Sequence, residues 1–336
     1  MRKFITIALL FLIVVTTPVY SQVDLTEINF SNVTSNRFDR NLRGWFGKVN
    51  EDVLKAGLVD PSGRVFFVDG NKSSAGKGSS WDDAFNTFAA AVTASNADIA
   101  TKAYRKWAAR NTIFVIGDDL IEDITVLPSK CDVRGLGSND AYGKASFDGT
   151  WIIPSTAASM GCHFYNCMFT ETGATMIFDV DGQYGLEFHG CLFDGAPATT
   201  GGILASECNW MVVNGCEFSA VAATRQFDTY AIKVENDTNA IYGVKIINNI
   251  IQTAGIGLDF DETAAYNCYA NGNVFMTDGM CIDSEDIAGL MVIGNRMITT
   301  LGEADNTSND FNILYAIDNI VTGGTGTLYI PSPADF

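Results

Sequence analysis

The sequence is poor in basic side chains and in histidine. Its 336 residues hold 21 Lys and Arg against 39 Asp and Glu, a formal net charge of -18, and only two histidines, His163 and His189. An acidic surface repels phosphate backbones and anionic lipid, so nucleic acid is not an expected partner. Two histidines also leave little room for a metal site built from several of them.

No apolar segment is long enough to span a membrane comfortably. The longest, residues 4–15, follows Arg2 and Lys3 and precedes a short segment that ends at Ser21, whereas a transmembrane helix needs about 20 apolar residues. This pattern predicts a signal peptide over residues 1–21, with an uncleaved anchor as the alternative. We therefore expect a secreted or cell-surface protein with no membrane span once the signal is removed.

The second half of the sequence contains a repeat. Seven strand-like segments align on one anchor position, with spacings of 24, 25, 33, 24, 22 and 24 residues. The third residue before each anchor and the second residue after it are apolar, as core-facing positions of a strand must be. The anchors are Cys167, Cys191, Cys216, Asn249, Asn273, Asn295 and Asn319.

A second strand follows each of the first five anchors. A unit of 22 to 25 residues without a helical period cannot bury its own apolar face, but stacked units can. The leucine-dense consensus of a leucine-rich repeat, the rival at this period, is absent. The pattern therefore predicts a right-handed parallel β-helix over residues 145–336. Alternation predicts one inward column on the second strand, formed by Phe178, Leu204, Val234, Leu258 and Ile282.

The anchor residues predict how the stack is held together at one bend. Four asparagines in register predict a ladder of side-chain amides, and the three preceding cysteines predict small buried residues at the same bend. The eight cysteines form no CxxC pair, and we expect free thiols, with a disulfide between adjacent coils as the alternative. We interpret His189, near Cys167 and Cys191, as a core histidine rather than a zinc ligand.

Residues 64–144 have a different pattern, which resembles a known family. The RVFFVDG strand, a Gly-rich turn, a SWDDAFNTFAAAV helix capped by Ser80, a second helical stretch ending at Arg110, and the IFVIG and VRGLG strands follow in order. They resemble the start of secreted pectate-lyase-like right-handed β-helix proteins. The resemblance covers residues 64 to about 321 and implies that the helix caps the open end of the stack. Residues 22–63 are interpreted as an arm or attachment segment.

Most of the negative charge belongs to the predicted coils. Residues 145–336 carry 23 acidic and 4 basic side chains. Carboxylates about 5 Å apart repel by about 3 kcal/mol at an effective dielectric near 20, so aligned carboxylates need solvent, a proton or a cation. A calcium-binding face and a solvated, aggregation-resistant face both remain open. The two predicted outward columns are Asp179, Ala205, Glu235, Asp259 and Asp283, and Asp181, Glu207, Asp237, Asp261 and Glu285.

An insertion between Ser219 and Tyr230 lies beside these columns, and loops on a rigid stack are where sites are usually built. In pectate-lyase-like enzymes, calcium-bound carboxylates acidify a uronate proton and a nearby Arg or Lys removes it, although no motif of a known lyase or polygalacturonase is present here. Hydrolysis by paired carboxylates is a further alternative. The resemblance implies catalytic roles for Arg225, Lys233 and Asp228, substrate binding by Phe227, Tyr230 and Glu235, and calcium ligation by Asp259, Asp261, Asp283 and Glu285.

Two functions follow from these observations. One is an exported β-helix protein that contacts extracellular polysaccharide or a cell-surface glycan, as a calcium-assisted lyase or a hydrolase. The other is a non-catalytic structural, adhesive or virion-spike protein, for which we expect a homotrimer.

Overall fold

The structure is a computed structural model. It describes residues 63–102, 109–117, 120–137, 143–157, 159–171, 173, 175–196, 199–219, 227–236, 239–261, 265–285, 290–299, 305–306, 313–317 and 319–322. The chain divides into two units, Met1–Gly63 and Arg64–Phe336, and the second is the one described below. The predicted signal peptide and arm lie outside the described residues. No helix in the described part is both long and apolar enough to cross a membrane.

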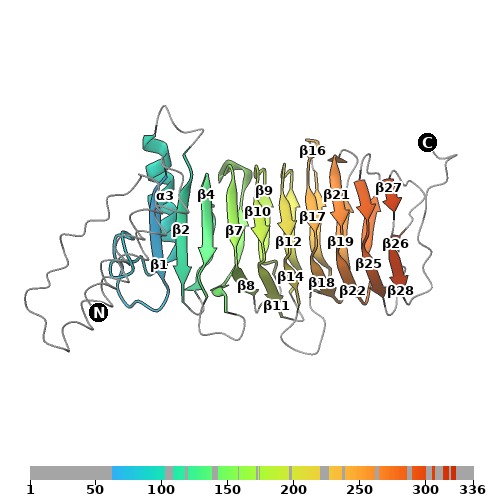
Figure 1. Ribbon diagram of the computed structural model, residues 1–336, viewed down its shortest axis with the longest axis horizontal. Helices are drawn as coiled ribbons and strands as arrows, with labels where there is room; N and C mark the ends of the chain where they lie inside the picture. Colours follow the sequence, from blue (N-terminus) through green and yellow to red (C-terminus); the bar gives the residue numbers. More distant parts are fainter. Residues whose placement is uncertain are drawn as a thin grey trace, which may run out of the picture. The chain divides into compact units, whose positions relative to one another are not determined.

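Three parallel sheets, here called A, B and C, form the second unit (Figure 1). From β4 onward the chain visits sheets A, B and C in turn, so each coil adds one strand to every sheet. Neighbouring strands pair in parallel throughout, as in the β7, β10 and β13 series. The predicted parallel β-helix is therefore confirmed.

Sheet A contains β1 (Val65–Asp69), β2 (Asn111–Ile116), β4 (Cys131–Gly135), β7 (Cys162–Tyr165), β10 (Glu187–His189), β13 (Val212–Asn214), β17 (Lys245–Ile247), β21 (Cys268–Asn271), β24 (Leu290–Ile293) and β27 (Ile313–Ile317). Sheet B contains β3 (Leu120–Ile121), β5 (Ala145–Asp148), β8 (Cys167–Glu171), β11 (Leu192–Gly195), β14 (Glu217–Phe218), β18 (Ile250–Thr253), β22 (Val274–Thr277), β25 (Arg296–Thr299) and β28 (Ile320–Thr322). Sheet C contains β6 (Trp151–Ile153), β9 (Phe178–Asp181), β12 (Gly201–Ser206), β15 (Tyr230–Glu235), β19 (Ile256–Asp261), β23 (Ile282–Glu285) and β26 (Asp305–Asn306). Two short strands, β16 (Ile241–Tyr242) and β20 (Ala265–Tyr266), pair separately.

The core is a stack of aromatic rings that point inward from the sheets. Phe164 and Phe188 of sheet A stack with ring centroids 5.4 Å apart, and Phe193 and Phe218 of sheet B stack at 4.4 Å. All four rings are fully buried. The same face of each strand therefore carries a like side chain in successive coils, which is why the anchor alignment detects the repeat.

The predicted asparagine ladder is present at the bend between sheets A and B. The Asn249 amide donates to Asn273 Oδ1 at 3.0 Å, and the Asn273 amide donates to Asn295 Oδ1 at 2.9 Å. Each amide also donates to a backbone carbonyl of the preceding coil, such as that of Ile246. The ladder continues from Asn295 to Asn319.

The cysteine anchors extend the same column toward the N-terminus. The backbone N–H of Cys216 donates to Asn249 Oδ1 at 2.8 Å, and its thiol lies 3.4 Å from the Phe188 carbonyl. Cys191 makes the equivalent contact with Phe164. All eight cysteines are free and buried, so the predicted free thiols are confirmed.

The described part of the chain contains one 3-10 turn, η3 (Ser155–Ala157), and one α-helix, α3 (Phe88–Thr101). It begins seven residues later than predicted, because Thr87 rather than Ser80 is the N-cap, with its hydroxyl accepting from the Ala90 N–H. The Glu122 carboxylate accepts from the first two N–H groups of the helix, as the helix dipole favours. Residues 103–108 of the second predicted helical stretch lie outside the described residues, and the capping role stays a prediction.

Candidate functional site

The outward columns of sheet C differ from the predicted ones. Leu204 was predicted to face inward, but it lies on the outer face beside Asp179. Val234 faces inward as predicted, but it pairs with Ala205 and Phe260 rather than with Leu204 and Leu258. Ala205 is buried, and Asp237 lies outside the described residues. The observed columns are Asp179, Leu204, Lys233, Asp259 and Asp283, and Asp181, Ser206, Glu235, Asp261 and Glu285.

These shifts have a physical reason in the sequence of β12 and β15. In β12, Ile203 and Leu204 are both apolar, so alternation alone cannot say which of them faces inward. Ile232 and Val234 of β15 both face inward, and the partner of Leu258 is Ile232. A slip of one residue exchanges the two faces of a strand, and in β12 it puts Leu204 and Ser206 in the places predicted for Ala205 and Glu207. In β15 the shift is two residues, so the same face stays outward, but Lys233 and Glu235 take the places predicted for Glu235 and Asp237. Glu207 lies in the turn after β12, where Asn239 donates to it.

Lys233 neutralises the carboxylates around it. Its ammonium lies 2.7 Å from Asp261 Oδ2, 3.2 Å from Glu235 Oε2 and 3.8 Å from Asp259 Oδ2. Burial alone would lower the pKa of Lys233, but the bond to Asp261 and the charge of Asp259 outweigh it and raise that pKa. A general base needs a free lone pair. These contacts disfavour Lys233 as a proton-abstracting base, and its catalytic role stays a prediction.

Asp259 is the carboxyl group with the most perturbed acidity in this cluster. Burial raises the pKa of Asp259 to about 7, and the charges of Asp283, Asp261 and Glu235 act in the same direction, against Lys233. Asp259 is therefore partly protonated near neutral pH. A shared proton and the Lys233 ammonium relieve the repulsion that the sequence predicted.

The predicted calcium ligands do not form a ready-made metal site. Within the described residues, no group of three or more His, Cys, Asp and Glu side chains has an arrangement that could hold a metal ion. The Lys233 ammonium lies next to two of the predicted ligands, Asp259 and Asp261. Glu285 has no described side chain. Calcium binding by Asp259, Asp261, Asp283 and Glu285 stays a prediction on which no step below depends.

Of the described residues predicted around the insertion, two are buried. Phe227 is fully buried, which disfavours contact with a ligand at the surface, and substrate binding by Phe227 stays a prediction. Tyr230 is largely buried, with its hydroxyl 2.8 Å from the sulfur of Met176, and burial raises its pKa to about 12. Asp228 is exposed. Arg225 lies outside the described residues.

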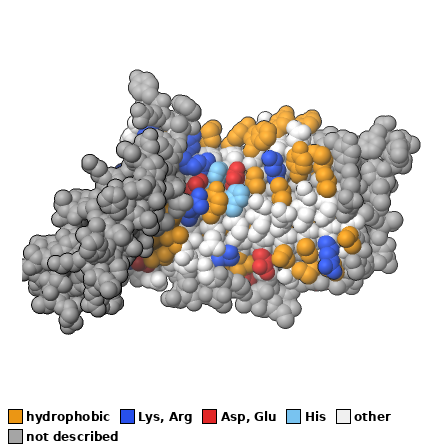
Figure 2. Space-filling view, in the orientation of Figure 1, with side chains coloured by type: hydrophobic (Ala, Val, Ile, Leu, Met, Phe, Trp, Pro, Cys, Tyr) orange, Lys and Arg blue, Asp and Glu red, His pale blue; other side chains and the backbone are white. Residues whose placement is uncertain are grey.

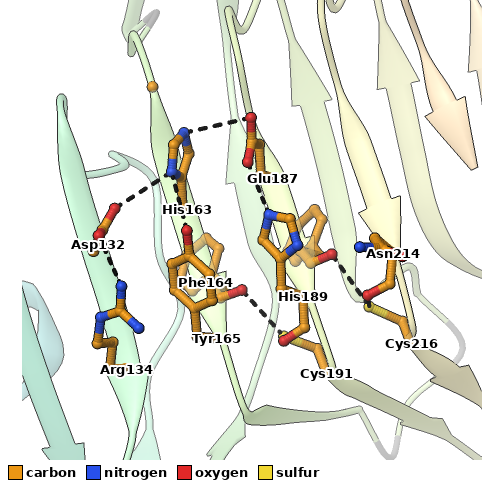
Figure 3. A network of polar contacts seen from close by, with 12 residues as sticks. Asp132, Arg134, His163, Phe164, Tyr165, Glu187, His189, Cys191, Asn214 and Cys216 are labelled. Atoms are coloured by element: carbon orange, nitrogen blue, oxygen red, sulfur yellow. Dashed lines mark hydrogen bonds and ion pairs between the residues drawn. The ribbon is translucent and has the colours of Figure 1, made fainter. Parts of the chain in front are cut away.

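A different set of polar side chains meets on the outer face of sheet A (Figure 3). Asp132, His163 and Glu187 occupy paired positions on β4, β7 and β10. His163 Nδ1 lies 3.3 Å from Asp132 Oδ1, and His163 Nε2 lies 3.7 Å from Glu187 Oε1. His189 Nε2 lies 2.8 Å from Glu187 Oε2. We call these four residues the sheet A network.

Two arginines and a lysine border the sheet A network. Arg110 Nη1 donates to Asp132 Oδ1 at 2.8 Å, and Arg134 Nη2 donates to Asp132 Oδ2 at 3.1 Å. Lys144 Nζ donates to the carbonyl of Gly190, directly after β10. Figure 2 shows the histidines on the visible face, with basic and acidic side chains next to them. Two arginines thus lie against Asp132, in a chain that is strongly acidic overall.

The contacts keep both network carboxylates ionised. Burial alone would raise the pKa of Asp132, but the hydrogen bond to His163 and the charge of Arg110 outweigh it and lower that pKa. The hydrogen bond from His189 lowers the pKa of Glu187 against the effect of burial. Each carboxylate is therefore a permanent acceptor beside a histidine.

Tyr165 lies beside the sheet A network and contacts both Arg134 and His189. The Arg134 guanidinium lies 4.2 Å from the centre of the Tyr165 ring, a cation–π distance. The other face of Tyr165 stacks on His189, with centroids 4.9 Å apart and an interplanar angle of 11°. Burial raises the pKa of Tyr165, so its ring stays neutral.

The Glu187 and His189 pair is the part of the network best placed for proton transfer. Glu187 accepts from His189 Nε2–H, which leaves the lone pair of a neutral imidazole on Nδ1. Within the described residues Nδ1 has no hydrogen-bond partner, and a quarter of the His189 side chain is exposed. A carboxylate that orients a histidine in this way is a common arrangement for general acid and base catalysis.

The sequence contained a signal for this network that was misinterpreted. His163 and Glu187 both lie four residues before a cysteine anchor, while Tyr165 and His189 both lie two residues before one. Anchors in register therefore place each pair side by side on adjacent coils. The interpretation of His189 as a core residue is wrong, because its ring is outward while the thiols of Cys167 and Cys191 are buried.

Comparison with known proteins gives few matches. No family model matches the sequence, and no curated protein matches it. A crystal structure of pectate lyase Pel9A is similar with 12% identity, a TM-score of 0.43, and coverage of 81% of this chain and 82% of that chain. The A-module of the Azotobacter vinelandii mannuronan C-5 epimerase AlgE6 is similar with 11% identity, a TM-score of 0.38, and coverage of 70% and 83%. The assignment of a parallel β-helix rests on the strand registers and not on these two similarities.

Proposed function

We propose that this protein is an exported β-helix protein that binds an extended anionic polysaccharide across sheet A, and that the sheet A network transfers protons on the bound glycan. The observation that carries the proposal is the Glu187 and His189 pair, in which Nδ1 of His189 has no hydrogen-bond partner within the described residues and a quarter of the side chain is exposed, in a network bordered by Arg110 and Arg134. A uronate supplies both a carboxylate for these cations and an acidic proton next to that carboxylate.

The proposed reaction is a β-elimination. His189 Nδ1 accepts the proton at the carbon that bears the uronate carboxylate, the adjacent carbon–oxygen glycosidic bond breaks, and a carbon–carbon double bond forms. The departing glycosidic oxygen takes up a proton from His163 or water, so no oxidant or co-reactant is needed. Arg110 and Arg134 stabilise the negative charge that develops at the carboxylate.

We expect the purified protein to release unsaturated products from polygalacturonate or alginate, measured by ultraviolet absorbance with calcium and with a chelator. Changing His189→Gln is expected to lower kcat about 100-fold with little effect on KM, because Gln keeps a polar group but cannot accept the proton. Glu187→Gln is expected to act in the same direction, since it disrupts the orientation of the ring. Asp82→Asn, at an exposed position before α3, serves as the control.

The same experiment separates this site from the one that the family resemblance implied. If Arg225→Ala abolishes turnover and His189→Gln does not, the chemistry belongs to the insertion beside sheet C and the proposal for sheet A fails. If the wild-type protein releases no product from any uronic-acid or neutral polysaccharide, the enzymatic proposal fails altogether.

A non-catalytic structural or adhesive function is the second candidate. The observation that favours it is that Arg110, Arg134, Asp132 and His163 satisfy one another, as in a network that only stabilises the coils. In that case light scattering of the full chain is expected to show a stable homotrimer, and no polysaccharide is expected to be turned over.

A further inference from the structure

A row of exposed aromatic side chains follows the turns that lead into sheet A. Tyr184, Trp210, Tyr242 and Tyr266 come from four successive coils, and between 43% and 47% of each is exposed. We call these four residues the aromatic row. In Figure 2 apolar side chains gather along the edge where Figure 1 places β16. Exposed aromatic side chains repeated at one place on a surface indicate a binding surface.

Trp210 occupies a backbone position that is unfavourable for it. Its φ is 59°, whereas glycine holds the equivalent left-handed position in three other coils, at Gly161, Gly185 and Gly243. The hydrogen bonds from the N–H groups of Gly185, Trp210 and Gly243 to the next coil establish this equivalence. A bulky side chain at positive φ is an outlier, and such strain is concentrated at functional sites.

The Trp210 ring forms a flat platform on the surface. A Cβ added at Gly243 would lie 2.4 to 3.0 Å from three atoms of the ring, so the ring covers the backbone at Gly243. Because 46% of Trp210 is exposed, the opposite face of the ring is open to solvent. Tyr242 and Tyr266 continue the row and stack on each other with centroids 5.3 Å apart.

An uncovered shelf lies between Trp210 and the sheet A network. A Cβ added at Gly185 would meet only backbone atoms of Gly161, at 3.6 and 3.7 Å. On the far side of this shelf, the Arg110 guanidinium lies over Gly161 and donates to its carbonyl. Adjacent coils are about 4.8 Å apart, so the shelf has about the width of one pyranose ring.

We infer that the aromatic row is an extended glycan subsite, in which a sugar ring lies on the Gly185 shelf against Trp210, with its carboxylate toward Arg110, and the following sugars cover Tyr242 and Tyr266. The inference rests on the proposed function and adds to it the direction and length of the bound chain. Charge complementarity selects an anionic glycan, because the Arg110 guanidinium lies at one end of the row, over Gly161. The glycan runs parallel to the coil axis, and its chain length determines how many aromatic side chains of the row it covers.

The test measures binding of oligogalacturonates, from the disaccharide to the hexasaccharide, to the full chain by calorimetry. Wild-type affinity is expected to rise with chain length. Trp210→Gly is expected to weaken hexasaccharide binding about tenfold, the size of a modest binding hot spot, and to leave disaccharide binding unchanged. Its melting temperature is expected to be no lower than that of the wild type, because glycine is the residue that adjacent coils use at this position. Trp210→Phe is expected to restore most of the affinity, and Ile121→Ala, at an exposed apolar residue of sheet B, is the control.

The outcomes separate this inference from the proposed function. If Trp210→Gly binds the hexasaccharide as the wild type does while His189→Gln abolishes turnover, the glycan subsite is overturned and the proposed function stands. If binding depends on length and on Trp210 but no product is released, the subsite stands and the catalytic proposal fails. If no oligosaccharide binds, or if Trp210→Gly instead dissociates an oligomer seen by light scattering, the aromatic row is not a glycan subsite.

Discussion

Changing Asn273→Ala is expected to lower the free energy of unfolding by about 3 to 5 kcal/mol, because each buried polar group left without a partner costs about 1 to 3 kcal/mol. Asn273 is fully buried. Its side-chain oxygen accepts from the backbone N–H and the amide of Asn249, both at 3.0 Å, and its amide donates to the Ile246 carbonyl at 2.9 Å. Alanine removes this side chain, so the Asn249 groups and the Ile246 carbonyl lose these hydrogen bonds in the buried interior of the stack.

Urea denaturation followed by circular dichroism measures this effect. Asn271→Ala is the matched control, because Asn271 is an exposed residue only two positions away and its loss is expected to change stability by less than 1 kcal/mol. Asn273→Asp is expected to destabilise as much as alanine does, since an ionised carboxylate cannot donate to the Ile246 carbonyl. Equal stability of Asn273→Ala and Asn271→Ala would mean that the ladder does not stabilise the stack.

The fold could be predicted from the sequence because the anchor column is nearly free of ambiguity. An Asn or Cys at each bend, with apolar residues at fixed offsets, determines the register of sheets A and B without knowledge of the loops. The same alignment placed His163 beside Glu187 and Tyr165 beside His189, as the strand pairing shows. The network was missed only because the histidines were considered singly.

The register of sheet C could not be predicted in the same way. Loops of variable length separate each anchor from the strand of sheet C, and the insertion before Tyr230 is the longest of them. Without a polar anchor in β12, neither Ile203 nor Leu204 could be assigned to the core by alternation. A one-residue shift in β12 and a two-residue shift in β15 changed a predicted column of carboxylates into one with Lys233 at its centre, and with it the chemistry expected of that face.

Changing Asp259→Asn is expected to stabilise the protein at pH 8 and to leave it nearly unchanged at pH 4. The folded state raises the pKa of Asp259 to about 7, above the value of about 3.9 expected in the unfolded chain. Between pH 4 and pH 7 the folded protein holds a proton that the unfolded chain has released. The contribution of Asp259 to stability is therefore fully present below about pH 4 and is lost as the pH rises through about 7, by up to about 4 kcal/mol.

Asparagine keeps the shape of Asp259 but cannot ionise, so the free energy of unfolding of the variant does not fall in this way as the pH rises through about 7. Lys233 retains Asp261 and Glu235 as partners in the variant. Unfolding free energies of both proteins from pH 4 to pH 8 test the prediction, with the exposed Asp228→Asn as the control. Asp261→Asn is expected to be destabilising, because it removes the partner closest to the Lys233 ammonium. A lower stability of Asp259→Asn than of the wild type at pH 8 would show that Asp259 is ionised and stabilising in the folded protein.

The same titration tests what neutralises the sheet C columns. If the Lys233 ammonium is sufficient after Asp259 has lost its proton, calcium is expected to leave the stability of the wild type unchanged at pH 8, and a chelator is expected to have no effect. If calcium raises wild-type stability at pH 8 but not that of Asp259→Asn, the predicted calcium ligands bind the ion once Asp259 has lost its proton. The cation would then replace the proton, since both relieve the same repulsion among Asp259, Asp261 and Asp283.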